Sequence, residues 1–286
     1  MTRNPAAQTA FGPMVLAAVE HWESPERRLV DDDLAAAFLP RGLRALVRVL
    51  RVGALRRAMV AASDRSGPGL WASIACRKRY IDERISDPFT EFDAVVILGS
   101  GLDTRPYRIA RYSELPVFEV DQQVNIDRKT AVVQRVLGAV PPSVRLVSVD
   151  FERDNVMNAL ADNGFHDTGR TLFIWEGVTQ YLTPEALHAT FEQLRTAVPG
   201  SRLIFTYVRQ DFIDGTNLYG AQSVYRKFRG KTQLWKSGFP PERVDEILQG
   251  YGWQLFEQAG PSYYRDTYIR PTGRTIEASQ VEWAAV

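Results

Sequence analysis

A short apolar segment that ends in two glycines constrains the fold of this chain more than any other feature. Ala94–Leu98 reads AVVIL and leads directly into Gly99-Ser100-Gly101, a pattern typical of a buried strand followed by a tight turn. Farther along the chain, a second strand pattern, Val117–Val120, is followed by Asp121. Strand and helix patterns then alternate from residue 70 to residue 260. This alternation predicts a parallel sheet with helices on both faces.

The turn after the first strand also restricts the ligand. Glycines let the backbone approach a ligand closely, and a carboxylate at Asp121 can accept hydrogen bonds from both hydroxyls of a ribose. A dinucleotide site needs a third glycine where this chain has Thr104, and Asp103 would repel phosphate groups. The pattern therefore favours a cationic nucleoside without phosphate, such as S-adenosylmethionine, over a nicotinamide dinucleotide.

Five segments of the chain carry a resemblance to a known family: VVILGSGLDTRPYRI, VFEVDQQ, VSVDFE, TLFIWEGVTQYLTPEAL and PGSRLIFTYV. They resemble the S-adenosylmethionine-dependent methyltransferases related to leucine carboxyl methyltransferase, in particular their bacterial branch. With flanking residues, the similarity runs from Arg77 to Tyr207. It implies an α/β fold of class I, a Rossmann-like seven-stranded sheet, with S-adenosyl-L-methionine as the cofactor. The segment after Tyr207 departs from the eukaryotic enzymes, so a protein phosphatase is not implied as the substrate.

The resemblance also implies which side chains hold the cofactor. They are Arg77 for the methionine carboxylate, Gly99, Ser100, Gly101 and Asp103 in the glycine loop, Asp121 for the ribose, Asp150 and Phe151 for the adenine, and Glu176 near the amino group.

The chain is expected to form a single methyltransferase domain over residues 1–286. Within it we expect an N-terminal helical lid at 1–70, a cofactor-binding core at 71–208, and a substrate-side insertion with the C-terminal strands at 209–286. Strands are predicted at Ala94–Leu98, Val117–Val120, Val144–Val149, Leu172–Trp175, Leu203–Val208, Gln254–Gln258 and Val281–Val286. Thr183 followed by Pro184 predicts the start of a helix.

Composition excludes several classes of protein. The formal net charge is +1, with 35 basic and 34 acidic residues, so no overall field attracts nucleic acid. The single cysteine, Cys76, rules out an internal disulfide, and no Cys/His spacing of a zinc site occurs. Met14–Val19 is too short for a signal peptide, and no segment approaches the roughly 20 apolar residues of a membrane span. We expect a cytoplasmic protein without a metal site, while the oligomeric state stays open.

One basic segment precedes the predicted sheet. Leu34–Ser63 has apolar residues at helical spacing with Arg44, Arg48 and Arg51 on one face. The simpler interpretation is the solvated face of a lid helix. The alternative is a docking surface for an acidic partner such as an acyl carrier protein, or for a membrane surface. Gly53 interrupts the helix, which weakens the docking interpretation.

The residue types also indicate the methyl acceptor. A carboxylate is already ionised at neutral pH and needs no base, whereas a hydroxyl does. None of the three histidines follows a predicted strand, where ligands of an α/β sheet gather. We therefore expect a small-molecule carboxylate, with a hydroxyl second, on a secondary metabolite that is free or bound to a carrier protein. Tyr181, Tyr207 and Arg209 follow or end predicted strands and are our candidates for gripping the acceptor.

Two other activities remain as alternatives. A nicotinamide-dependent reductase would fit the glycine loop, but Thr104, Asp103 and the lack of a suitable Tyr-x-x-x-Lys pair oppose it. A non-catalytic cofactor-binding scaffold would use the arginine-rich segment to dock a partner. The sequence opposes methylation of cytosine carbon or of adenine nitrogen, because Cys76 precedes the glycine loop and the fourth strand leads into Glu176-Gly177-Val178-Thr179.

Overall fold

A seven-stranded sheet forms the centre of the computed structural model, which describes residues 9–86, 91–231 and 233–286. The strand order is β3-β2-β1-β4-β5-β7-β6, with β1 to β5 parallel and β7 antiparallel to both of its neighbours. The strands are β1 (Ala94–Leu98), β2 (Val117–Asp121), β3 (Val144–Ser148), β4 (Thr171–Trp175), β5 (Arg202–Val208), β6 (Gln258–Ala259) and β7 (Glu282–Ala285). The predicted class I methyltransferase fold and all seven strands are confirmed, although β6 is shorter than Gln254–Gln258 and displaced toward its end.

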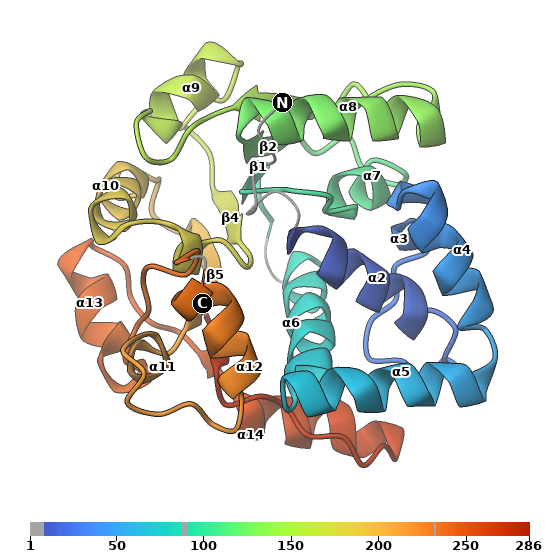
Figure 1. Cartoon of the computed structure of the whole chain (residues 1–286). Helices are drawn as coiled ribbons and strands as arrows, with labels where there is room; N and C mark the ends of the chain where they lie inside the picture. The colour runs from blue at the N-terminus through green and yellow to red at the C-terminus, as the bar shows by residue number, and fades with distance from the viewer. Residues whose placement is uncertain (1–8, 87–90, 232) are drawn as a thin grey trace.

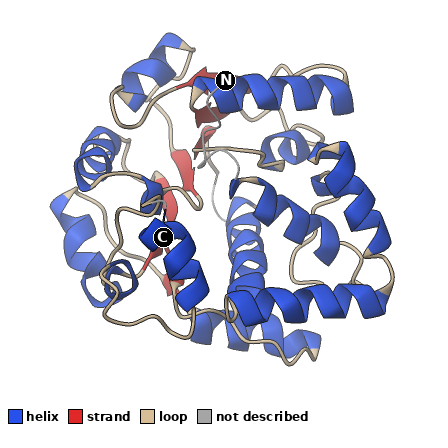
Figure 2. Cartoon of the chain, in the orientation of Figure 1, coloured by secondary structure: helices blue, strands red, loops and turns tan. Residues whose placement is uncertain are grey.

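Helices flank this sheet on two sides, with the strands between them (Figure 2). Before β1 come α2 (Phe11–Glu20), α3 (Ala35–Phe38), α4 (Arg41–Val49), α5 (Gly53–Ser66) and α6 (Leu70–Ile85). Between strands lie α7 (Arg105–Ile109), α8 (Gln123–Leu137), α9 (Val156–Asp162), η1 (Thr179–Tyr181) and α10 (Pro184–Leu194). After β5 come α11 (Gln210–Ile213), α12 (Gln222–Tyr225), η2 (Arg226–Lys231), η3 (Pro241–Arg243), α13 (Val244–Gly250), α14 (Pro261–Tyr264), η4 (Arg265–Ile269) and η5 (Arg270–Thr272).

Side-chain alternation along the strands divides the core into two layers. In β1, Val95 and Ile97 pack with the layer of α2, α6 and α14, whereas Val96 and Leu98 pack with the layer of α9, α10 and α13. In Figure 1, α2 and α6 lie to the right of the sheet and α9, α10 and α13 to its left. Because both faces of β1 are covered, its sequence is continuously apolar rather than alternating.

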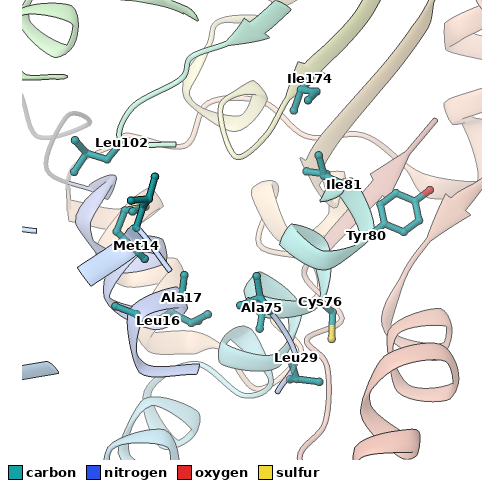
Figure 3. Close-up of a cluster of buried hydrophobic side chains, with 14 of the residues drawn as sticks. Met14, Leu16, Ala17, Leu29, Ala75, Cys76, Tyr80, Ile81, Leu102 and Ile174 are labelled. Carbon is teal, nitrogen blue, oxygen red and sulfur yellow. The ribbon is translucent and has the colours of Figure 1, made fainter. Parts of the chain in front are cut away.

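The N-terminal helices pack as one layer against the sheet. Met14, Leu16 and Ala17 of α2 lie across from Ala75 and Cys76 of α6 (Figure 3). The start of α2 lies beside the loop that follows β1, because Ala10 is next to Gly101 of that loop. Residues 1–8 of the expected lid are outside the described residues. Among the residues that the structure describes, no helix is long and apolar enough to cross a membrane.

The expected helix over Leu34–Ser63 is divided into α3, α4 and α5, and Gly53 is the first residue of α5. The predicted helix start at Thr183 is confirmed, because the Thr183 side chain accepts a hydrogen bond from the Ala186 amide at the beginning of α10.

One buried ion pair secures β2 to α8 beneath the glycine turn. The side chains of Glu119 and Lys129 are fully buried and paired, and the Tyr107 hydroxyl donates to Glu119. Lys129 Nζ also donates to the Ser100 carbonyl at 3.4 Å. Burial raises the pKa of Glu119 to about 7 against the opposing effect of Lys129.

Replacing this lysine should destabilise the fold strongly. Lys129→Met should lower the free energy of unfolding by about 3–5 kcal/mol at pH 8, because it leaves a buried carboxylate without its cation. Part of the loss should be recovered toward pH 5, because a buried carboxyl with a raised pKa stabilises the folded state below that pKa. Urea denaturation at both pH values measures the two effects.

Arg135→Met on the exposed part of the same helix is the matched control; it removes one exposed hydrogen bond, to the Ala37 carbonyl at 2.8 Å, and should change stability by no more than about 1 kcal/mol. Equal stability of the two variants at pH 8 would contradict the structural role of the pair.

Candidate functional site

A cavity of about 940 Å³ opens at the carboxyl ends of β1, β2, β3 and β4. Strand order reverses between β1 and β4, and ligands of open α/β sheets bind at such a point. The first turn of α2 and one side of α6 line the cavity from the N-terminal layer, and residues 227–228 and 233–236 line it from the segment after β5. Nine predicted cofactor residues lie along it: Arg77, Gly99, Ser100, Gly101, Asp103, Asp121, Asp150, Phe151 and Glu176.

The turn after β1 needs glycine for two separate reasons. Gly99 has φ +71°, and a Cβ atom there would lie 2.3 Å from Cγ2 of Val178. Gly101 has φ +47°, a conformation that side chains disfavour, and a Cβ atom there would lie 3.4 Å from Ala10. The turn therefore brings the backbone against both the loop after β4 and the N-terminal helix.

Asp121 joins this turn to the end of β2. Its Oδ2 accepts a hydrogen bond from the Gly101 amide at 2.7 Å, and its Oδ1 accepts from the Gln122 amide and the Asn125 side chain, both at 2.7 Å. These bonds fix the orientation of the carboxylate at the wall of the cavity. A ligand hydroxyl beside the glycine turn would meet an acceptor that is already positioned.

Glu176 is the centre of a buried charge network behind the cavity. Arg77 Nε donates to its Oε1 at 2.9 Å and Arg105 Nη1 donates to its Oε2 at 2.5 Å, while Lys78 Nζ lies 3.8 Å from Oε1. Burial alone would raise the pKa of Glu176, but the positive charges of Lys78, Arg105 and Arg77 outweigh burial and hold this pKa well below its usual range. Glu176 is therefore a fixed anion at neutral pH.

The same network reaches two more carboxylates. Arg105 Nη1 pairs with Asp103 at 2.7 Å, and Arg77 pairs with Glu282 of β7. Burial raises the pKa of Glu282 despite Arg77, whereas for Asp103 the charges of Arg105 and Lys78 outweigh burial and lower the pKa. Cations and anions thus alternate along one wall of the cavity. This arrangement suits a ligand group that itself carries both charges, such as the ammonium and carboxylate of an amino acid.

Asp150 and Phe151 lie at the end of β3, on another wall of the cavity. The Phe151 ring stacks on Trp175 with centroids 6.4 Å apart, and Asp150 Oδ1 accepts from the Glu152 amide at 3.2 Å. A flat apolar ring beside a hydrogen-bond acceptor is suited to one face and the amino edge of a purine.

The three acceptor candidates are separated by the fold. Tyr181 lines the cavity. Tyr207 and Arg209 are not among the described residues that line it: Tyr207 is fully buried beside Phe205 and Phe239, and its hydroxyl accepts from Gln258 at 2.9 Å. Arg209 instead pairs with Asp211 at 3.0 Å. The sequence places both residues near a strand end, but Tyr207 packs in the core layer of α10 and α13, and Arg209 is held by a neighbouring carboxylate.

Several cavity residues were missed by the sequence analysis: Lys78, Arg105, Gln180, Lys236 and Glu282 line the cavity or its charge network. Glu282 did leave a signal, since it is the one charge in the terminal apolar segment Val281–Val286. From the segment after β5, Phe228 and Trp235 also line the cavity, and their rings stack with centroids 4.7 Å apart.

The described residues that line the cavity include none of the three histidines. His21 bonds Asp31 at 2.8 Å and His188 bonds the Tyr251 hydroxyl at 2.8 Å, both away from the site. Within the described ranges, no group of three or more His, Cys, Asp or Glu residues could hold a metal ion.

Fold and site together define a class I methyltransferase architecture. Two solved structures share the fold: a candidate methyltransferase from Thermobifida fusca, with TM-score 0.59 and 18% identity over 100% of this chain and 97% of that one, and a DUF574 family protein from Streptomyces avermitilis, with TM-score 0.56 and 16% identity over 79% and 87%.

Sequence comparison identifies the family. The leucine carboxyl methyltransferase model matches residues 10–195, and the chain belongs to this family of S-adenosylmethionine-dependent methyltransferases, as predicted. A relative from Mycolicibacterium paratuberculosis, named as a candidate S-adenosyl-L-methionine-dependent methyltransferase, is 36% identical over 64% of this chain. The alignment spans 61% of that relative's own length. A relative of the same description from Mycolicibacterium smegmatis is 30% identical over 89% of this chain and 84% of its own length.

The cavity fits the cofactor of this family. The glycines at 99 and 101 clear space that side chains would fill, and Gly177, with φ +70°, allows the Arg77 guanidinium to approach the loop after β4. Asp121 would hold the ribose, Asp150 and Phe151 the adenine, and Arg77 with Glu176 the charged amino-acid end. These assignments use residues that the fold has already brought to one cavity.

Removing the Asp121 carboxylate should weaken binding of S-adenosylmethionine and its demethylated product. Each charge-assisted hydrogen bond to a ribose hydroxyl contributes about 1.5–3 kcal/mol, so Asp121→Ala should raise the Kd at least about tenfold. Isothermal titration calorimetry measures this change. Asp127→Ala, on the exposed face of α8, removes a carboxylate outside the cavity and is the control that should leave the Kd unchanged. An equal Kd in Asp121→Ala and the unaltered chain would show that the ribose residue is misassigned.

Proposed function

We propose that the protein transfers a methyl group from S-adenosylmethionine to a carboxylate oxygen of a small molecule. The observation that carries this proposal is one cavity that combines a complete set of candidate cofactor residues with no unengaged base among its described residues. A carboxylate acceptor needs no proton removed at neutral pH. The site therefore has to position its reactants rather than activate them.

The carboxylates of the cavity support this interpretation. Asp103, Glu176 and Glu282 are held by arginines, and Asp121 accepts from three donors. Of the remaining two, Glu152 pairs with Lys236 at 2.9 Å, and Asp150 accepts from a backbone amide. Each of these carboxylates thus has a hydrogen-bond or ion-pair partner. To act as a general base for a hydroxyl acceptor, one of them would have to lose that partner.

The acceptor would enter from the side formed by η1 and the segment after β5. Tyr181, Leu182, Phe228 and Trp235 supply aromatic and apolar surface there, with Lys236 at the edge. Burial raises the pKa of Tyr181, so its hydroxyl stays protonated and is a hydrogen-bond donor to an anionic oxygen. Tyr207 and Arg209, which do not reach this surface, have no part in the proposed acceptor contact.

When bound, S-adenosylmethionine would supply an electrophilic methyl carbon for an in-line displacement by a carboxylate oxygen of the acceptor, with the electron pair of the carbon–sulfur bond left on sulfur. The charged wall around Glu176 would hold the amino-acid end still, while Asp121 fixes the ribose, so that the reacting atoms stay aligned.

Two finer points about the identity of the methyl acceptor rest on the sequence and remain proposals. A secondary metabolite, free or carried by another protein, suits a cavity at the upper end of the usual size for ligand sites. A hydroxyl acceptor is the second candidate. The reductase alternative is disfavoured by Asp103, whose lowered pKa keeps a negative charge where a dinucleotide would place phosphate.

Calorimetric titration should detect saturable binding of S-adenosylmethionine and its demethylated product, and no binding of NAD or NADP at the same concentrations. The reason is that Thr104 stands where a dinucleotide turn needs its third glycine, and that the ionised Asp103, although paired with Arg105, lies beside the turn. Saturable NAD binding without a response to S-adenosylmethionine would overturn the methyltransferase proposal.

The acceptor class should appear in the pH dependence of the reaction. With any carboxylic acid from a substrate panel that is turned over, the rate should be nearly constant from about pH 6 to pH 8, because the acid is ionised throughout. The ester product should release methanol in mild alkali. An alkali-stable methyl product with a rate that rises over this range would replace the carboxylate proposal with a hydroxyl acceptor.

A further inference from the structure

The N-terminal helices carry an exposed surface that the proposed reaction does not use. Residues 34–63 contain six arginines and no acidic residue, although the whole chain has a net charge of only +1. Every residue of α5 is exposed or half-buried. In Figure 1, α4 and α5 form the outer corner of this helical layer, on the side away from the sheet.

Apolar side chains interrupt the arginines at this corner. Leu46, Val49, Val52 and Leu55 are 43%, 54%, 56% and 45% exposed, and they make up four of the eight large hydrophobic side chains exposed in the described parts of the chain. Their spacing of three residues carries the row from the last turn of α4, through the connection, into the first turn of α5. Gly53 therefore bends this surface but does not end it.

Two of the six arginines make local contacts that hold the bend between α4 and α5. Arg56 Nε pairs with Glu23 at 2.7 Å and its Nη1 donates to the carbonyls of Leu50 and Arg51, while the Arg51 guanidinium lies 4.0 Å from the ring centre of Trp22. These two arginines stabilise the bend.

Of the other four arginines, Arg44 is half-buried and three are left to solvent. Arg41, Arg48 and Arg57 are exposed, and none has an ion-pair partner in the part of the chain that the structure describes. Their charge is available to an anionic partner.

We propose that this corner, which we name the α4–α5 corner (Arg41–Arg57), binds the surface of an anionic lipid bilayer. Exposed leucine and valine side chains can enter the boundary between headgroups and acyl chains, while arginines between them extend to the phosphate level. Anionic headgroups complement a segment that has six positive charges and no negative one.

Two other occupants fit the corner less well. A second copy of this chain, related by a two-fold axis, would place the arginine-rich surface against itself. An acidic protein would satisfy the charge, but the four exposed apolar side chains between the arginines are better matched by the apolar interior of a bilayer than by an acidic, polar surface. An acidic polypeptide is therefore treated as a competing outcome of the experiment.

The test is co-sedimentation of the full chain with vesicles of phosphatidylcholine alone or with 30% phosphatidylserine, a composition chosen to give about the surface charge of a cytoplasmic leaflet. We expect binding to the anionic vesicles at about 0.1 M salt, at least tenfold weaker binding at about 0.5 M salt, and little binding to neutral vesicles. Equal binding to both vesicle types, or to neither, would overturn the proposal.

Two variants separate the charge from the apolar row. Arg41→Ala/Arg48→Ala/Arg57→Ala should weaken binding to anionic vesicles at least tenfold, because each arginine near such a surface contributes attraction. Val49→Ser/Val52→Ser should weaken binding at least threefold at either salt concentration. Thermal unfolding and S-adenosylmethionine titration of the same samples show whether each variant is folded.

A matched control removes the same charge elsewhere. The control variant is Arg153→Ala/Arg195→Ala/Arg243→Ala. These three arginines lie beside α9, α10 and α13, on the other side of the sheet, and their side chains are 82%, 58% and 61% exposed. The control variant should bind anionic vesicles as the unaltered chain does. An equal loss in the control would show that binding follows the overall charge and would overturn the lipid proposal. Salt-sensitive binding to polyglutamate, under conditions where the anionic vesicles stay unbound, would overturn it in favour of an acidic protein partner.

Discussion

The ion pairs around Glu176 connect the parts of this molecule that must stay in register for the cavity to exist. Glu176 follows β4, Arg77 lies on α6, Arg105 begins α7, and Glu282 begins β7. Removing so many charges from water costs a large free energy, and their mutual attraction offsets that cost only when every partner is present. Such a network is weak evidence for stability. It does specify geometry, because no single member can move without leaving a buried charge unpaired.

The glycine turn and the charge network depend on one another. Gly177 follows Glu176 and gives the Arg77 guanidinium room, while Gly99 allows the loop after β1 to pack on Val178 of the same segment. Asp121 then pins the turn from the neighbouring strand through the Gly101 amide. The loops after β1, β2 and β4 are therefore held by contacts among themselves. This arrangement is typical of a site that binds its ligand with little rearrangement.

The sequence predicts the sheet well, because its strands are short apolar runs that end at glycine or at a carboxylate. It predicts the direction of side chains poorly in β5: this strand is apolar on both faces, so alternation does not reveal that Tyr207 points into an aromatic cluster. The weak sixth strand was misplaced because an edge strand of two residues is defined by its pairing with β7. Glu282 reaches the cavity only because β7 returns antiparallel beside β5, a tertiary event.

Charge is used in two contrasting ways in this chain. In the cavity, positive and negative side chains are buried together, so the site can select a group by the arrangement of its charges while its own net charge stays small. At the α4–α5 corner, exposed arginines stand without carboxylates and project a field of one sign, which attracts but does not discriminate finely. At one end α2 packs against α4, next to the hydrogen bond that Trp22, just after the helix, donates to the Val47 carbonyl. At its other end α2 lines the cavity, so a single helix spans the two regions. An attachment at the corner would thus fix the orientation of the cavity entrance relative to whatever surface the corner contacts.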